Sequence, residues 1–211
     1  MIKVSYVDHM GTDLTVVNAA RVSFGTAKTK LDDKDIKLIN YLAKHKHMSP
    51  FEHCQLSVLV ECPLYIRSQI HRHRTFSYNE ISRRYTDKDL EFFIPKTIRK
   101  QSKDNRQASE GKLASQDNAK NIMNGAWSKA KAYYDLLIGM GVPREQARGV
   151  LPTGTMTHFY MTGNLRNWAH FIGLRDHEGA QGEVQEVAIA VKAIIKDKFP
   201  VAYEALEKAG E

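Results

Sequence analysis

One short stretch of the chain concentrates side chains that can bind an anion. Residues 67–85, RSQIHRHRTFSYNEISRRY, hold five arginines, two histidines and a single acid, Glu80. The planar guanidinium of arginine can bind two phosphate oxygens at once, so this density of arginine predicts a site for a phosphorylated ligand. A solvated cluster of surface arginines is the alternative, and composition alone does not separate the two.

The elements around this stretch favour a binding site. Residues 54–61, CQLSVLVE, predict a strand that leads into it. Pro63 suits the first turn of a helix. The apolar side of that helix would consist of Leu64, Ile66 and Ile70. Gln69, Arg72 and His73 then fall at positions i, i+3 and i+4, so we expect them to share one face of the helix.

The order of these residues resembles a known signature. Arg72-His73-Arg74, followed by seven residues and Ser82, resembles the RHR-x7-S motif of the flavin-dependent thymidylate synthases. The extended pattern of that family also fits Asn79, Glu80, Arg84 and Tyr85. Further similar segments are HMSPFEH at 47–53, NLRNWAHFIGLR at 164–175 and AQGE at 180–183.

The resemblance implies an enzyme, a methyltransferase with a defined reaction. Such an enzyme converts dUMP to dTMP with the one-carbon unit of 5,10-methylenetetrahydrofolate. FAD carries the hydride and NADPH reduces the flavin. Because the cofactor supplies the hydride, the protein has to bind, orient and polarise its ligands. An arginine-rich chain without an evident nucleophile and base suits that demand.

The resemblance also implies which residues bind each ligand. The dUMP site would consist of Gln69, Arg72, Glu80, Ser82, Arg83, Arg84, Arg148 and Arg175. The FAD site would consist of Ser23, Ser49, Arg72, His73, Arg74, Asn79, Glu80, Asn164, Arg166 and His170. Arg175 is the implied catalytic residue, because a cation at the pyrimidine edge stabilises negative charge as the ring becomes nucleophilic.

At two positions the chain departs from the family pattern. Many members carry a histidine just before the Ala-Gln pair, where this chain has Gly179. Some relatives have asparagine where this chain has His170. Both positions concern contacts to the isoalloxazine edge, so the expected flavin site depends mainly on the RHR segment.

Composition limits the class of protein. The chain has 211 residues, 42% hydrophobic and 26% charged, as in a globular protein of one domain. A net charge of +7 favours anionic partners, among them nucleotides, folates and nucleic acid. No signal peptide and no membrane-spanning apolar run is evident, so a cytoplasmic protein is expected. Cys54 and Cys62 are expected to be small buried residues on one strand face.

Other functions remain open from the residues alone. A basic RNA- or DNA-binding protein would explain the charge, but residues 94–118 lack interleaved aromatic side chains that stack on bases. Another flavoprotein that acts on a nucleotide is a second alternative. A metal site is not expected, because the histidine pairs 45/47 and 71/73 diverge on a helix and HExxH is missing.

The expected fold is a single α+β domain over residues 1–211, with a small, mostly antiparallel sheet packed against several helices. Relatives of the family are homotetramers whose active sites draw on several subunits, so we expect the same assembly here. Strands are expected at 2–7, 54–61 and 155–162. Helices are expected at 12–24, from 32 or 33 to 45–47, from about 119 to 139, after Asn164, and at 180–199, where Pro200 bounds the last. Residues 86–118 are expected to form a solvated connection, and the apolar stripe of the 119–139 helix, including Met123 and Trp127, to join the core.

Overall fold

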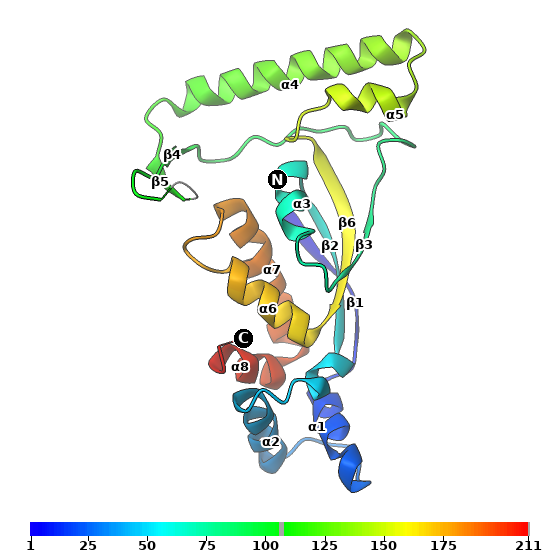
Figure 1. The fold of residues 1–211 in the computed structure, drawn as a ribbon, viewed down its shortest axis with the longest axis vertical. Coiled ribbons are helices and arrows are strands. Elements are labelled where there is room, and N and C mark those ends of the chain that lie inside the picture. Colours follow the sequence, from blue (N-terminus) through cyan, green and yellow to red (C-terminus); the bar gives the residue numbers. More distant parts are fainter. Residues whose placement is uncertain (106–107, 211) are drawn as a thin grey trace.

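A four-stranded antiparallel sheet forms the centre of the computed structural model, which describes residues 1–105 and 108–210. The strands lie in the order β1-β2-β6-β3 (Figure 1). They comprise β1 (Lys3–Met10), β2 (Gln55–Pro63), β6 (Met156–Asn164) and β3 (Ser77–Glu80). Side chains along β2 and β6 alternate between buried and more exposed positions, because successive residues of a strand point to opposite faces.

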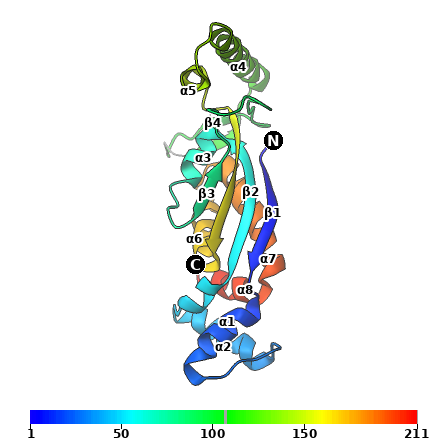
Figure 2. The same cartoon turned by 90° about the vertical axis from the view of Figure 1, so that its right-hand side faces the viewer.

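Helices cover one face of this sheet, and Figure 2 shows the strands in front of them. The helices in contact with the strands are α3 (Leu64–Ile70), α6 (Leu165–Arg175) and α7 (Gly182–Lys198), and α8 (Pro200–Lys208) packs against α6 and α7. Trp168 is fully buried between sheet and helices, and its indole N–H donates to the carbonyl of Leu56 at 3.1 Å. On the opposite face Tyr160 of β6 is 49% exposed. The core therefore lies on the helical side of the sheet.

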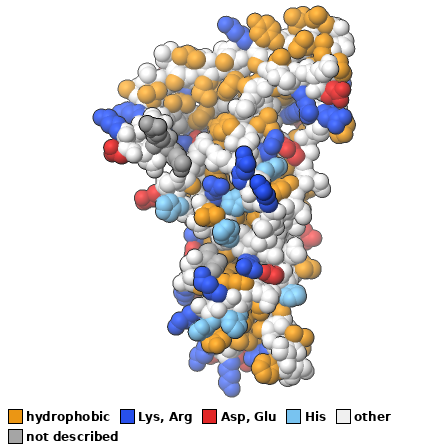
Figure 3. Space-filling model, in the orientation of Figure 1, with side chains coloured by type: hydrophobic (Ala, Val, Ile, Leu, Met, Phe, Trp, Pro, Cys, Tyr) orange, Lys and Arg blue, Asp and Glu red, His pale blue; other side chains and the backbone are white. Residues whose placement is uncertain are grey.

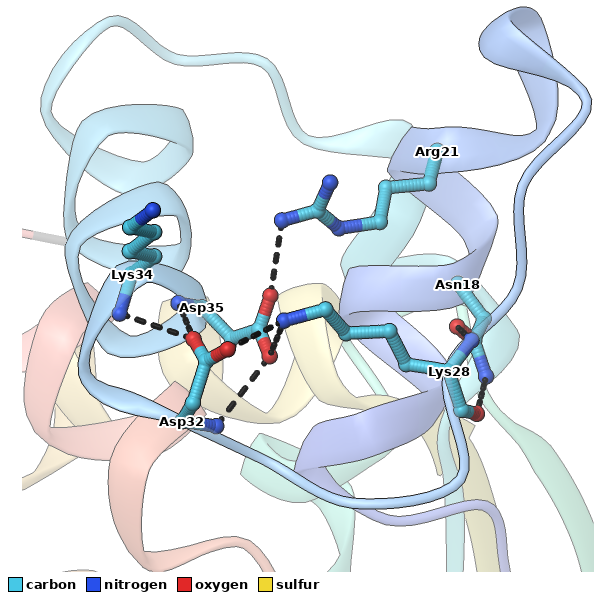
Figure 4. Close-up of polar contacts among 6 residues, drawn as sticks. All are labelled: Asn18, Arg21, Lys28, Asp32, Lys34 and Asp35. Carbon is cyan, nitrogen blue, oxygen red and sulfur yellow. Dashed lines mark hydrogen bonds and ion pairs between the residues drawn. The ribbon is translucent and has the colours of Figure 1, made fainter.

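The lower end of the molecule in Figure 1 consists of α1 (Asp13–Arg21), α2 (Asp33–Lys44) and two short 3-10 helices, η1 (Val22–Phe24) and η2 (Ser49–His53). A buried carboxylate fastens the loop between α1 and α2 (Figure 4). Asp35 accepts from Arg21 and from the Lys28 ammonium, both at 2.8 Å. The Asn18 amide bonds the backbone N–H and C=O of Lys28. Both ends of the segment that contains Ser23 are therefore tied down.

The upper end contains a long helix, α4 (Gln116–Gly139), which lies across the top of the molecule. It is flanked by the two-stranded sheet of β4 (Arg99–Gln101) and β5 (Ser109–Lys112), and by α5 (Arg144–Ala147) and the 3-10 helix η3 (Arg148–Val150). Tyr134 is the buried residue of α4, and Met123 and Trp127 are half-buried. The expectation that the whole apolar stripe joins the core is wrong, because Ile122 and Tyr133 are each at least 60% exposed.

The sequence predicted the long strands and most helices, and the α+β fold is confirmed. Besides the α4 stripe, three expectations fail. Residues 86–118 contain β4 and β5 in addition to irregular chain, and Pro200 begins a further helix, α8. The helix after Pro63 ends at Ile70, so Gln69, Arg72 and His73 do not share a helical face. The chain turns there to reach β3, a strand too short for alternation to reveal.

Asp13 joins the two ends of the chain and should contribute measurably to stability. Its buried carboxylate accepts the backbone N–H groups of Val201 and Ala202, at 3.1 and 2.8 Å, and so caps α8. We expect Asp13→Ala to lower the free energy of unfolding by about 2 kcal/mol, because the substitution leaves buried donors without an acceptor. Urea denaturation measures the change.

Two variants control this test. Asp13→Asn keeps one acceptor oxygen and should lose less stability than Asp13→Ala. Glu204→Ala removes only an exposed ion pair with Lys208 on α8, and should cost a few tenths of a kcal/mol. Equal losses in all three variants would contradict the capping role of Asp13.

Candidate active site

A cleft of about 510 Å³ opens where α3, β3 and β6 meet the α5–η3 segment. The charged and hydroxyl side chains in its lining are Arg67, Glu80, Ser82, Arg83, Glu145, Arg148, Thr155 and Thr157. Glu80, Ser82, Arg83 and Arg148 belong to the dUMP site expected from the sequence. The fold therefore brings together four residues of that set from two parts of the chain separated by more than 60 positions.

Glu80 is held in place inside the cleft. It lies opposite Phe159 in the β3–β6 register and faces the helical side of the sheet. The Thr157 hydroxyl donates to its Oε1 at 2.6 Å, and the Arg67 Nε lies 3.2 Å from the same oxygen. Arg67 belongs to the arginine-rich stretch but was not assigned to a site, because only the contact between α3 and β3 brings it against Glu80.

The neighbouring arginines take different roles. Arg83 donates to the backbone carbonyls of Lys88, Asp89 and Met156, so its guanidinium holds the turn after β3. Arg84 is exposed, lies 3.5 Å from Glu145, and is outside the cleft lining. Arg83 therefore supports the cleft wall, and Arg84 lies near its rim.

A second, shallower cleft of about 310 Å³ lies beside the first, and its lining is strongly basic. It is lined by Arg67, Ser68, His71, Arg72 and Arg74. Arg67 lines both clefts. Figure 3 shows Lys, Arg and His side chains gathered on the middle of one face of the molecule. Two members of the expected flavin site, Arg72 and Arg74, are thus exposed in a cationic groove next to the expected nucleotide site.

Arg175 and His73 form a direct pair. The Arg175 Nε donates to the His73 Nε2 at 3.0 Å, and the His170 ring lies 6.4 Å from the His73 ring. An arginine side chain cannot accept a hydrogen bond, so His73 must be neutral with its proton on Nδ1. The pKa of His73 is lowered to about 4, firstly by burial and then by the charges of Arg175 and His170. The pair therefore consists of the charged Arg175 guanidinium and an uncharged His73 ring.

Other expected flavin residues lie along the start of α6. Asn164 caps this helix and accepts the backbone N–H of Asn167 at 2.9 Å. Arg166 donates to Glu52 of η2 at 2.6 Å, and η2 begins with the exposed Ser49. The Asn167 amide also donates to the carbonyl of Thr75, which ties the loop after the RHR triplet to α6.

Three expected residues lie apart from these groups. Asn79 is exposed and pairs with Tyr160 in the β3–β6 register, so it lies on the open face of the sheet. Ser23 is exposed in η1, at the lower end of the molecule. Gln69 is half-buried and donates to Gln181 at the start of α7. One copy of the chain therefore does not gather the whole expected flavin site.

The two cysteines have the surroundings of core residues, as the sequence predicted. Both Cys54 and Cys62 are fully buried. Burial, followed by the charge of Asp13 at Cys54 and of Glu80 at Cys62, raises the pKa of each thiol to about 12. Thiols with so high a pKa are poor nucleophiles near neutral pH.

Two kinds of feature are absent from the part of the chain that the structure describes. Residues 1–105 and 108–210 contain no group of three or more His, Cys, Asp or Glu side chains placed to hold a metal ion. Within the same residues, no helix is both long enough and apolar enough to cross a bilayer.

Comparison with known proteins gives the family of the chain. Residues 5–201 match the sequence model of the family described as "Thymidylate synthase complementing protein". The flavin-dependent thymidylate synthase of Thermus thermophilus is 42% identical over 205 residues, which cover 97% of this chain and 75% of that protein. The chain belongs to the flavin-dependent thymidylate synthase family.

Further relatives agree with this membership. The flavin-dependent thymidylate synthase of Kosmotoga olearia is 43% identical over 201 residues, covering 94% of this chain and 87% of that protein. Among solved structures, a UMP/dUMP methylase, PolB from Streptomyces cacaoi with bound 5-Br dUMP, is 32% identical with a TM-score of 0.92. The match covers all of this chain and 96% of that one.

The neutral state of His73 predicts how stability depends on pH. Above pH 6.5 His73 is neutral in both the folded and the unfolded chain, and its contribution to stability is complete. As the pH falls from 6.5 towards about 4, the unfolded chain binds a proton that the folded chain does not, so this contribution is lost. The difference in unfolding free energy between wild type and His73→Gln should therefore shrink over this range.

NMR titration of the His73 ring measures the pKa directly. In Arg175→Met the pKa should rise above the wild-type value but stay below 6.5, because burial, the larger cause, remains. Arg175→Lys keeps the positive charge and should leave the pKa low. A wild-type His73 that titrates at its ordinary pKa would contradict the pairing.

Proposed function

We propose that this protein is a flavin-dependent thymidylate synthase that methylates dUMP to dTMP. The proposed one-carbon donor is 5,10-methylenetetrahydrofolate, the cofactor is FAD and the reductant is NADPH. The observation that best supports this proposal is that the arginine-rich stretch, which resembles the family motif, lines two adjoining clefts. One of them also contains Arg148, and four of the five residues that line the other are Arg or His. As an enzyme of nucleotide synthesis, it is expected in the cytoplasm.

The first cleft suits a nucleotide monophosphate. We assign the phosphate to the Ser82 hydroxyl and the Arg148 guanidinium, with Arg84 at the rim. Within residues 1–105 and 108–210, the Arg148 side chain makes one hydrogen bond, from its Nε to the carbonyl of Glu145 at 3.4 Å, which leaves its terminal nitrogens for a ligand. Glu80, held by Thr157, adds a fixed acceptor for a donor group of the nucleotide.

The second cleft fits the chemistry of FAD. The diphosphate of FAD is an anion, and the exposed guanidinium groups of Arg72 and Arg74 in this cleft are suitable hydrogen-bond donors for it. FAD supplies the hydride chemistry when it is bound. His73 and Arg175 are the residues we place at the junction of flavin and pyrimidine, because they are paired and come from two of the segments that resemble the family.

Arg175 is the proposed catalytic residue. Its guanidinium remains charged at any working pH, and the neutral His73 fixes its Nε without neutralising it. The terminal nitrogens can then donate to a carbonyl oxygen of the uracil ring, where negative charge develops as C5 becomes nucleophilic. This polarisation replaces attack by a thiolate, for which the buried Cys54 and Cys62 are unsuited.

The role of Arg175 can be tested against the cysteines. We expect the Cys54→Ser, Cys62→Ser double variant to keep most dTMP synthesis, because neither thiol takes part. Arg175→Ala should lose dTMP formation at least a hundredfold, in line with the loss of one stabilising donor in a polar transition state, and still bind flavin. Product analysis and the visible flavin spectrum are the measurements.

Three outcomes would count against this proposal. A double cysteine variant that holds FAD but makes no dTMP, together with an active Arg175→Ala, would contradict the mechanism. Purified wild-type protein without flavin bands after addition of FAD would contradict the function itself. Tight binding to RNA or DNA without turnover of dUMP would favour a nucleic-acid-binding protein.

We further propose that the protein works as a homotetramer. The expected flavin residues lie on both faces of the sheet and at its lower end, so neighbouring subunits would complete each site. The exposed apolar residues of α4 provide a contact surface. Successive helical residues are rotated by about 100°, so the side chains at 122, 133, 136 and 140 form one narrow stripe. The apolar residues of that stripe are Ile122, Tyr133, Leu136 and Met140, the last of which is the C-terminal cap of α4, and each is at least 60% exposed. The exposed Lys129 lies on the same side, between Ile122 and Tyr133.

Charge in this stripe should disrupt assembly. We expect the Leu136→Glu, Met140→Glu double variant to sediment as a smaller species than wild type and to lose both turnover and flavin retention. Asn124→Glu with Ser128→Glu adds the same charge to other exposed positions of α4 and should leave the assembly intact. A fully active monomer in sedimentation velocity would contradict the proposal.

A further inference from the structure

The turn between α3 and β3 carries the RHR triplet, whose side chains point to different places. Arg72 and Arg74 line the basic cleft, whereas His73 faces Arg175. The backbone N–H of His73 closes the turn by donating to the carbonyl of Ile70 at 3.0 Å. Side chains that bind or polarise a ligand need a fixed backbone, so the contacts that hold this turn matter for the site.

Tyr78 of β3 reaches this turn from the sheet. It lies opposite the fully buried Met161 in the β3–β6 register, so its side chain points to the helical side. Its hydroxyl lies 2.8 Å from the carbonyl oxygen of His73 and 3.1 Å from that of Ile70, and donates to both in a shared hydrogen bond. One side chain of the strand therefore holds both ends of the turn.

The carbonyl of His73 depends on this hydroxyl. Among residues 1–105 and 108–210, no other group donates a hydrogen bond to it, whereas the Ile70 carbonyl also accepts the backbone N–H of His73. Burial raises the pKa of Tyr78, so the hydroxyl keeps its proton and remains a donor at neutral pH. Loss of the hydroxyl would leave the His73 carbonyl without a partner and let the backbone of the triplet move.

The ring of Tyr78 has a separate contact, with His71. The two ring centroids lie 4.1 Å apart, and His71 lines the basic cleft. The pKa of His71 is lowered, firstly by burial and then by the charge of Arg67, whereas the charge of Glu80 raises it. Tyr78 thus contacts His71 through its ring and His73 through its hydroxyl, and substitutions can separate the two contacts.

We infer that Tyr78 is a positioning residue whose hydroxyl fixes the backbone of the RHR triplet, and with it the pairing of His73 with Arg175. The same bond sets the direction from which Arg72 and Arg74 face the ligand of the basic cleft. The inference rests on the proposed function only where it names that ligand as FAD. Because Tyr78→Phe keeps the aromatic ring and removes only the donor, this variant isolates the hydroxyl.

NMR titration of the histidine rings in the full chain tests the positioning role without any ligand. In Tyr78→Phe the pKa of His73 should rise above its wild-type value of about 4, because a freed backbone lets the ring leave its buried place beside Arg175. The pKa of His71 should stay at its wild-type value, since the ring that covers it remains. Tyr78→Leu, which also removes the ring, should raise the pKa of both histidines.

Tyr65→Phe is the matched control. Tyr65 is half-buried on α3, and its hydroxyl makes no hydrogen bond within residues 1–105 and 108–210. The same chemical change at this position should leave the pKa of both histidines as in wild type.

Titration of the flavin-free chain with FAD, followed by quenching of the flavin fluorescence, measures the second consequence. Tyr78→Phe should bind FAD about fivefold more weakly than wild type, the usual effect of one neutral hydrogen bond. Tyr65→Phe should bind FAD as wild type does.

Three results would overturn the inference. An unchanged pKa of His73 in Tyr78→Phe would mean that the hydroxyl does not hold the triplet. Equal rises in the pKa of His71 and His73 in that variant would mean that the substitution loosens the whole region, as loss of any packing residue would. Wild-type affinity of Tyr78→Phe for FAD would mean that the cleft arginines do not depend on the hydroxyl.

Failure of the proposed function would look different. Wild-type protein that does not bind FAD would contradict that function, while the two histidine titrations would still decide whether Tyr78 positions the triplet.

Discussion

The pairing of β2 with β6 is the constraint on which the site depends. Nine consecutive residue pairs, from Gln55 opposite Asn164 to Pro63 opposite Met156, join these strands without a bulge. At one end β2 leads directly into α3 with Arg67, and at the other end β6 leads into α6. Because α6 runs back along the sheet for 11 residues, about 16 Å, its last residue, Arg175, reaches His73. A shift of one residue in this register would turn every inward side chain to the open face.

Arginines of this molecule differ in the partners that hold them, and three of them show the contrast. Arg21 and Arg99 are paired with the buried carboxylates of Asp35 and Glu183, and they hold elements together. Arg175, by contrast, is held by a neutral imidazole. Its positive charge is therefore oriented but not cancelled, which suits the binding of negative charge. Whether the charge of an arginine is neutralised or left for a ligand thus depends on the residue that binds the guanidinium.

One copy of the chain contains only part of the expected site. Its clefts gather nucleotide-binding candidates around Glu80 and Arg148, whereas Asn79 and Ser23 lie on the open face and at the lower end. The long α4 helix carries an apolar stripe that the rest of the described chain does not cover. The scattered site residues and the uncovered stripe have one explanation if several copies of the chain contribute to each site. Contact between the copies would then bury the stripe of α4 and bring the missing residues to the clefts.

The sequence alone determined the family resemblance, the central strands and the amphipathic helices. Motifs such as Arg72-His73-Arg74 are contiguous, and the alternation in β2 or the helical period in α7 records how residues face the core. The sequence did not reveal β3, too short for a pattern, or α8, whose first residue is a proline that also ends helices. It also predicted a buried stripe on α4, because periodicity marks an apolar face without naming what covers it.

Only the tertiary structure decided the contacts that define the chemistry. Residues 102 positions apart form the Arg175–His73 bond, and 112 positions separate Gln69 from Gln181. Arg67 meets Glu80 only because the chain turns after Ile70 to form β3. Local sequence sets the propensity of each segment, but the protonation state of His73 and the partner of Gln69 depend on neighbours brought from elsewhere. A hydrogen bond assigns its donor and acceptor only when both partners are present, and the fold supplies the second partner.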